Sequence, residues 1–225
     1  MLLAVMALVT GLFWFSRVPT ARDRSGFLIG MAVLVVIFVS PLCALTVALF
    51  SARVVHHVLL VAVAAPLLAW ALIGLCRAQT PRLALALPHL TTPLLVLHTV
   101  IFWLWHIPDA YALALSSTSL YWVMQATLLG SALLFWASVL LATPGRAIAA
   151  LIGIAIQMGL LGALLVFSAT PLYFPHLGTT AAFGLSPLED QQLAGLIMWV
   201  PASLPYLLVA VLRLGTWLRS EARQA

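Results

Sequence analysis

Ionisable side chains are rare in this sequence, and those that could bind a metal ion fall mostly into three short groups. The first group is Arg53-Val-Val-His56-His57. Arg53 and His57 are four residues apart and share a face of a helix, whereas His56 points about 100° away. Neutral imidazole is the commonest metal ligand in proteins. The two histidines could therefore bind a metal ion, or they could be amphipathic residues at a membrane interface.

The second group is the segment 103–111, which holds three aromatic residues around His106. Pro108 predicts the end of a helix, which places His106 in its last turn, and Asp109 could cap the short helix that follows. An aromatic belt with a helix stop explains Tyr111 and the two tryptophans. It does not explain His106.

The third group begins with two acids, Glu189 and Asp190. Glu189 has the spacing of a helix-capping acid, and Asp190 would gain from the positive end of the same helix. Gln191, Gly195 and Met198 then follow at helical spacing, which predicts one stripe facing a neighbouring helix. Met198 could bind a soft copper ion, although packing is the more common role of methionine.

The composition indicates that these groups are positioned by membrane helices. Of the 225 residues, 64% are hydrophobic and 7% are charged, and the mean hydropathy is +1.18. A soluble domain is about half apolar and a quarter charged. We therefore expect an all-α integral membrane protein that forms a single transmembrane domain over residues 1–225, in contact with the lipid bilayer.

The hydrophobic pattern predicts about seven transmembrane helices, because each span needs about 20 apolar residues. The segments lie at roughly 2–16, 26–49, 54–75, 92–107, 119–142, 147–168 and 191–212. Nine of the arginines lie after the first, third, fifth and seventh segments: Arg17, Arg22, Arg24, Arg77, Arg82, Arg146, Arg213, Arg219 and Arg223. The positive-inside rule then places the N-terminus outside and the C-terminus inside.

Smaller signals refine this topology. Ser186-Pro187-Leu188-Glu189 has the form of a capping box, and Pro201 and Pro205 should kink the last span. The small residues Gly153, Gly159 and Gly162 predict close packing of the sixth span. His98 lies inside the fourth span and needs a polar partner. His89 and His176 are expected in loops, exposed to solvent.

Several functions are disfavoured by what the sequence lacks. All ten basic residues are arginines placed as topology signals, so a nucleic-acid surface is not expected. Without lysine, no retinal Schiff base can form. Cys43 and Cys76 make no CxxC pair, so no disulfide or thiolate metal site is indicated. No pair of nucleophile and base suggests an enzyme.

At the three polar groups the sequence resembles the polytopic CtaG family of cytochrome c oxidase assembly proteins. The matching segments are His57-Val-Leu-Leu with Ala65-Pro66-Leu-Leu, Trp105-His106-Ile-Pro108-Asp-Ala-Tyr111, and Asp190-Gln191-Gln192-Leu-Ala-Gly195-Leu-Ile-Met198-Trp199. The resemblance implies a chaperone of the bacterial cell membrane that docks to an oxidase subunit and handles copper at the outer face. The sequence departs from the family at Arg53 and Gln125, where the family tends to have histidine, and at His56, where glutamine is usual.

Under this reading, His57 and His106 are expected to bind copper transiently, with Asp190 as a third ligand or an orienting partner. The residues expected to support this site are Arg53, His56, Asp109, Tyr111, Gln191 and Met198. A metal-free scaffold of the oxidase is the main alternative, and an Arg53–Asp190 ion pair would indicate it. A small transporter or a haem protein with His57 and His106 as axial ligands is a further alternative.

Overall fold

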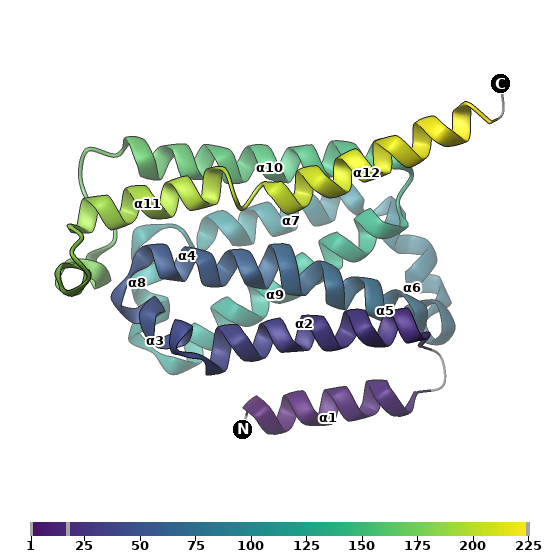
Figure 1. Cartoon of the computed structure of the whole chain (residues 1–225), viewed down its shortest axis with the longest axis horizontal. Coiled ribbons are helices and arrows are strands. Elements are labelled where there is room, and N and C mark those ends of the chain that lie inside the picture. Colours follow the sequence, from purple (N-terminus) through teal and green to yellow (C-terminus); the bar gives the residue numbers. More distant parts are fainter. Residues whose placement is uncertain (1, 17–18, 224–225) are drawn as a thin grey trace.

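The computed structural model describes residues 2–16 and 19–223, and these residues form an all-helical bundle (Figure 1). The α-helices are α1 (Leu2–Phe15), α2 (Ala21–Val39), α3 (Pro41–Ala48), α4 (Phe50–Val58), α5 (Ala65–Gln79), α6 (Pro81–Ala86), α7 (Thr91–Leu104), α8 (Pro108–Ser116), α9 (Thr118–Leu141), α10 (Pro144–Phe167), α11 (Pro187–Trp199) and α12 (Leu204–Glu221). The π-helix η1 (Leu59–Ala64) joins α4 to α5, and the 3₁₀ turns are η2 (Leu87–His89), η3 (Phe174–His176) and η4 (Thr180–Phe183).

Four helical stretches are long and apolar enough to cross a membrane. They are Phe50–Gln79, Thr118–Leu141, Pro144–Phe167 and Pro187–Glu221. Two bent pairs pass the same test together: α2 with α3, bent by 51°, and the α6–η2 stretch with α7, bent by 78°. By length and composition, the described residues thus hold four candidate spanning helices, or up to six if each bent pair is one span. The sequence predicted seven spans, and the first of them corresponds to the shorter apolar helix α1.

Different elements of the chain lie at the two ends of the bundle (Figure 1). At one end lie α3, α8, the start of α4 and the loop between α10 and α11. At the other end lie α6 and the C-terminal turns of α12. The three polar groups of the sequence therefore gather at one end, as their predicted depths required. Arg17, one of the residues behind the predicted orientation, lies outside the described residues.

Local signals for helix ends are confirmed in α11 and α12. Ser186 N–H donates to Glu189 Oε2 at 2.8 Å, and Glu189 N–H donates to Ser186 Oγ at 3.3 Å. This reciprocal pair is the predicted capping box. The helix that it starts ends at Trp199, and the chain turns once before α12 begins at Leu204. The break contains Pro201, as predicted for a proline that cannot continue a hydrogen-bond ladder.

Helices α10 and α11 approach each other at two glycines. A Cβ atom on Gly195 would lie 2.7 Å from the carbonyl oxygen of Gly162, and one on Gly162 would lie 2.8 Å from the carbonyl oxygen of Gly195. Only residues without a side chain allow backbones to come this close. The predicted close packing is therefore confirmed at Gly162, and its partner is the predicted stripe of α11.

The π-helix η1 begins two residues after His57, and Pro66 together with a distant tryptophan accounts for its hydrogen bonds. In a π-helix each N–H donates five residues back, and Ala65 N–H donates to Leu60 in this way. Pro66 has no N–H, so the carbonyl of Val61 loses its expected donor. Trp136 of α9 replaces it, because its indole Nε1–H donates to Val61 O at 2.9 Å. The π-helix is thus held in place by a side chain from another span.

Candidate functional site

Two histidines from different elements meet at the polar end of the bundle. His57 lies in the last turn of α4 and His106 in the turn after α7, and both are buried. Their ring centroids are 6.0 Å apart, with an interplanar angle of 79°. The structure thus brings together two residues that are 49 positions apart in the sequence (106 − 57).

The backbone fixes the orientation of His106. Its Nδ1 lies 2.6 Å from the carbonyl oxygen of Phe102, so Nδ1 must carry the proton and donate. Its own carbonyl accepts the hydroxyl of Tyr173 at 2.8 Å, which ties the long loop to this turn. His106 lies two positions beyond Leu104, the last residue of α7, rather than in its last turn as predicted. With Nδ1 engaged, Nε2 is the nitrogen left to bind a metal ion.

Several polar atoms next to His57 have no partner. Gln125 Nε2 lies 3.5 Å from His57 Nε2, which is a weak contact. Among the described residues, both ring nitrogens of His56, Nδ1 of His57 and Oε1 of Gln125 are buried without a hydrogen bond. The His56 ring lies 5.8 Å from the His57 ring. Buried polar atoms normally form hydrogen bonds with protein, with water or with an ion. Because these atoms have no protein partner, the cluster is suited to hold a water molecule or an ion.

Asp190 is occupied elsewhere. Its Oδ2 accepts the backbone N–H of Phe50 at 2.7 Å, and its Oδ1 accepts the N–H of Ser51 at 3.2 Å and the Ser51 hydroxyl. The carboxylate of α11 therefore caps the N-terminus of α4, where its charge is favoured by the helix dipole. The structure brings His57 and His106 together but not the three predicted ligands, and within 2–16 and 19–223 no three His, Cys, Asp or Glu residues form a metal-binding group.

Arg53 does not pair with Asp190. Its guanidinium donates from Nη2 to the carbonyl oxygen of Thr46 at 3.0 Å. The Asp190 oxygens are taken by Phe50 and Ser51. The ion pair expected for a metal-free scaffold is therefore not formed.

Tyr111 and His176 form a second polar pair beneath the loop. The Tyr111 hydroxyl lies 2.8 Å from His176 Nε2, and both side chains are buried. The expectation of a solvated His176 is wrong, because the loop folds back and covers it. Burial raises the pKa of Tyr111 to about 12 and lowers the pKa of His176, so both groups are held neutral.

The remaining predicted residues lie away from the two histidines or serve the fold. Gln191 accepts the N–H of Leu172 at 2.6 Å and donates to Leu165 O at 3.2 Å, which fastens the loop to α11. Met198 is 1% exposed and packs in the core. Asp109 is exposed in the first turn of α8 but makes no capping bond there, so its predicted role as a cap is wrong.

The two other histidines differ in their surroundings. His98 Nδ1 lies 2.9 Å from the Ser131 hydroxyl, which supplies the predicted partner inside the span. His89 is exposed at the opposite end of the bundle. No sequence pattern predicted the contacts of Tyr173, a loop residue, or of Ser51, whose partner Asp190 lies 139 positions away.

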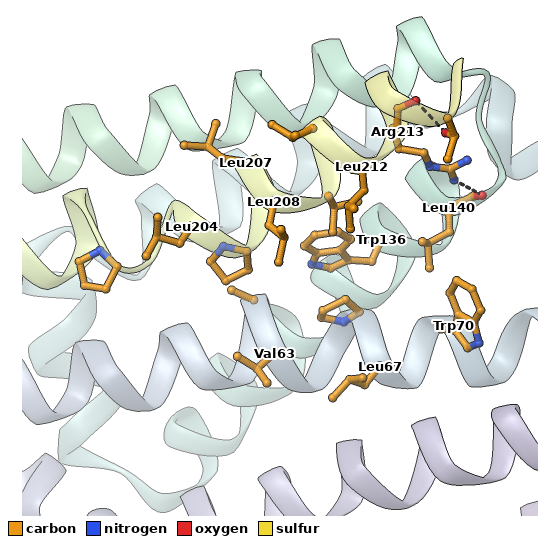
Figure 2. Close-up of a pocket in the computed structure, with 17 residues that line it drawn as sticks. Val63, Leu67, Trp70, Trp136, Leu140, Leu204, Leu207, Leu208, Leu212 and Arg213 are labelled. Carbon is orange, nitrogen blue, oxygen red and sulfur yellow. Dashed lines mark hydrogen bonds between the residues drawn. The ribbon is translucent and has the colours of Figure 1, made fainter. Parts of the chain in front are cut away.

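A large apolar groove lies away from the histidines. Figure 2 shows a groove of about 1320 Å³ between α5 and α12, with Leu67, Leu208 and Leu212 along its walls and Trp136 at its floor. Arg213 lies at one end and donates to Val139 O at 3.2 Å and to Leu140 O. An apolar groove without a metal-binding side chain does not fit a metal ion.

One comparison with known proteins identifies a family. The model of the cytochrome c oxidase caa3 assembly factor family (Caa3_CtaG) matches residues 2–220. No curated protein and no solved structure matches the chain.

Proposed function

Since the chain belongs to the caa3-type cytochrome c oxidase assembly factor family, we propose that it is a non-catalytic membrane chaperone that helps a copper centre of the oxidase to mature. In this proposal His57 and His106 bind a cuprous ion in transit. The oxidase subunit that receives the ion docks at the same end of the bundle.

The separation of the two imidazoles carries the proposal. A metal–nitrogen bond is about 2 Å and a ring centre lies about 1 Å behind its nitrogen, so an ion between two imidazoles separates the ring centres by about 6 Å. The observed separation of the centroids is 6.0 Å. Imidazole is a suitable ligand for copper. The Phe102 carbonyl holds one of the two rings before any metal arrives.

The small number of ligands fits a transient site. A closed four-ligand site retains its metal and often contributes to folding. Here two imidazoles meet, with the amide of Gln125 beside them. Asp190 acts in this proposal as a structural cap of α4, and it supports His57 only through the position of that helix.

The proposed topology follows the sequence. Helix α1, the two bent pairs and the four long helices together give seven spans, with the N-terminus outside and the C-terminus inside. This arrangement puts the histidine pair at the outer face of a bacterial cell membrane. The arginines that follow alternate spans support this orientation.

A metal-free scaffold remains the second candidate, and one observation favours it. Asp190, Gln191 and Tyr111 all form internal hydrogen bonds across different elements. These contacts hold the elements at the polar end in fixed positions. A partner subunit could then recognise this end of the bundle without a metal ion. The two candidates differ in whether His57 and His106 bind copper.

Cuprous-ion stoichiometry on detergent-purified protein tests the proposal. We expect about one bound copper per chain in the wild type and its loss in His57→Ala and in His106→Ala. His89→Ala is the matched control, because it removes an exposed histidine at the other end of the bundle, and it should retain the ion. Absence of copper from the wild type, together with intact oxidase assembly in the double variant His57→Ala/His106→Ala, would reject the copper role in favour of the scaffold.

A further inference from the structure

Arg53 is a buried cation for which the described chain supplies no counter-ion. It is 1% exposed, and its Nε and Nη1 have no hydrogen-bond partner among the described residues. Its single hydrogen bond runs from Nη2 to the carbonyl oxygen of Thr46. Removing an ion from water is strongly unfavourable unless the ion is paired. The guanidinium therefore lacks the partner that its burial requires.

None of the five acids makes a hydrogen bond to this guanidinium among the described residues, although Asp190 lies at the first turn of the same helix. Asp190 caps α4, and Glu189 and Asp23 complete the capping boxes of α11 and α2. Glu221 accepts the indole of Trp217 in the last turn of α12. Asp109 is exposed on α8. A group in direct contact with the free donors of Arg53 would then come from outside the chain.

A small pocket adjoins the guanidinium. Its volume is about 210 Å³, and it is lined by residues of α3, the end of α8 and the start of α9, including Cys43, Ser117 and Tyr121. The Arg53 Cζ lies 5.3 Å from the centre of the Tyr121 ring. The Tyr121 hydroxyl is itself buried without a partner. Unused donors of two side chains thus border one cavity, which reaches the surface at the exposed residues Val47 and Thr118.

We propose that this pocket binds a small oxyanion, a carboxylate or a phosphate group, through Arg53 and Tyr121. Arginine is suited to both groups, because its planar donors match their oxygens and its charge is permanent. A water molecule occupies about 30 Å³, so a pocket of about 210 Å³ has room for such a group together with a few waters. The proposal concerns a site separate from the histidine pair and does not depend on copper binding.

Cys43 gives a direct reporter for the site, because it lines the pocket and is a free cysteine. In a Cys76→Ala background, the rate of Cys43 modification by a negatively charged thiol reagent is compared with that of a positively charged one. A cationic cleft raises the local concentration of anions by about tenfold or more. We expect the negative reagent to react about tenfold faster in the wild type, and this preference to disappear in Arg53→Gln.

Protection by added anions then identifies the ligand. Acetate or inorganic phosphate should slow the modification of Cys43, whereas sodium chloride at the same ionic strength should not. Protection by acetate alone assigns the site to carboxylates, and protection by phosphate alone assigns it to phosphate groups. Tyr121→Phe, which keeps Arg53, should weaken the protection. Arg146→Gln is the control, since it removes an arginine bonded to Pro88 O away from the pocket.

Two results would overturn the proposal. One is equal protection of Cys43 by chloride and by the oxyanions, which would mean simple screening of charge. The other is protection that persists in Arg53→Gln, in a sample whose elution volume and melting temperature match those of the wild type. If Arg53→Gln does not fold, the comparison of Tyr121→Phe with the wild type decides the same question.

Discussion

Asp190 on α11 accepts the backbone N–H of Phe50 at the start of α4, although 140 positions separate the two residues in the sequence. The same carboxylate accepts the N–H and the hydroxyl of Ser51. One buried acid thereby satisfies backbone donors that the first turn of a helix leaves open. It also fixes the helix that carries His57 against the last long span.

Replacing this acid should lower stability without touching the histidine pair. We expect Asp190→Ala to reduce the free energy of unfolding by about 1.5–3 kcal/mol, the usual range for a charged hydrogen bond. Thermal melting in detergent measures the loss. Asp109→Ala removes an exposed acid from the same end and should leave the melting temperature unchanged. A variant that melts like the wild type but loses copper would instead make Asp190 a metal ligand.

The contact between α10 and α11 yields a second prediction. Because a methyl group on Gly195 would lie 2.7 Å from the Gly162 carbonyl oxygen and 2.8 Å from Val166, the helices must separate in Gly195→Ala. Overpacking of this kind costs about 1–3 kcal/mol. The melting temperature should fall accordingly.

The control for this substitution lies in α9. A Cβ on Gly130 would meet no atom within 4 Å. Alanine at that helical position should be neutral or stabilising by up to about 1 kcal/mol, because alanine is the better helix former. Equal melting temperatures for Gly195→Ala and Gly130→Ala would show that the two helices do not meet at the glycines.

Features with local causes were predictable from the sequence. The capping box depends on two residues three positions apart, Ser186 and Glu189, so its spacing alone predicted the start of α11. The stripe that contains Gly195 follows from helical periodicity, and so does the all-helical class. In both cases the relevant interactions lie within a few residues along the chain.

Features that depend on distant partners were not predictable. The role of Asp190 requires Phe50, and the burial of His176 requires the loop to fold back on Tyr111.

The sequence analysis predicted a continuous span at 26–49, whereas the helix bends between α2 and α3. Ser40 begins the second part by accepting the N–H of Leu42 at 3.2 Å. Ser40-Pro41 was a local signal for this bend, because the residue before a proline avoids helical geometry.

The π-helix after His57 gives the third prediction. Trp136→Phe keeps an aromatic ring near Tyr206 but removes the donor to Val61 O. A buried carbonyl without a donor costs about 1–3 kcal/mol, and the melting temperature should fall. Trp70→Phe changes a half-exposed indole in the apolar groove and should have little effect.

A second substitution separates this bond from the loss of volume. Pro66→Ala restores a backbone N–H at the position that a π-helical ladder would pair with Val61 O. In the Trp136→Phe background it should therefore recover part of the lost stability. If it recovers none, the cost of Trp136→Phe arises from packing rather than from the unpaired carbonyl.

The buried pair of Tyr111 and His176 predicts a dependence of stability on pH. Burial holds the pKa of His176 below its ordinary value of 6.5. Below pH 6.5 the unfolded chain therefore binds a proton at this residue that the folded chain does not, and the free energy of unfolding falls as the pH is lowered. Protonation would also leave His176 Nε2 able only to donate to the Tyr111 hydroxyl.

The fourth prediction follows from this sign. Between about pH 7.5 and about pH 5.5, a range that spans the ordinary histidine pKa, the melting temperature of the wild type should fall more steeply than that of His176→Gln. The difference between the two slopes isolates this residue from the other histidines. His89→Gln, which changes an exposed histidine, should keep the slope of the wild type. Parallel slopes for the wild type and His176→Gln would mean that the loop opens and that His176 titrates in water.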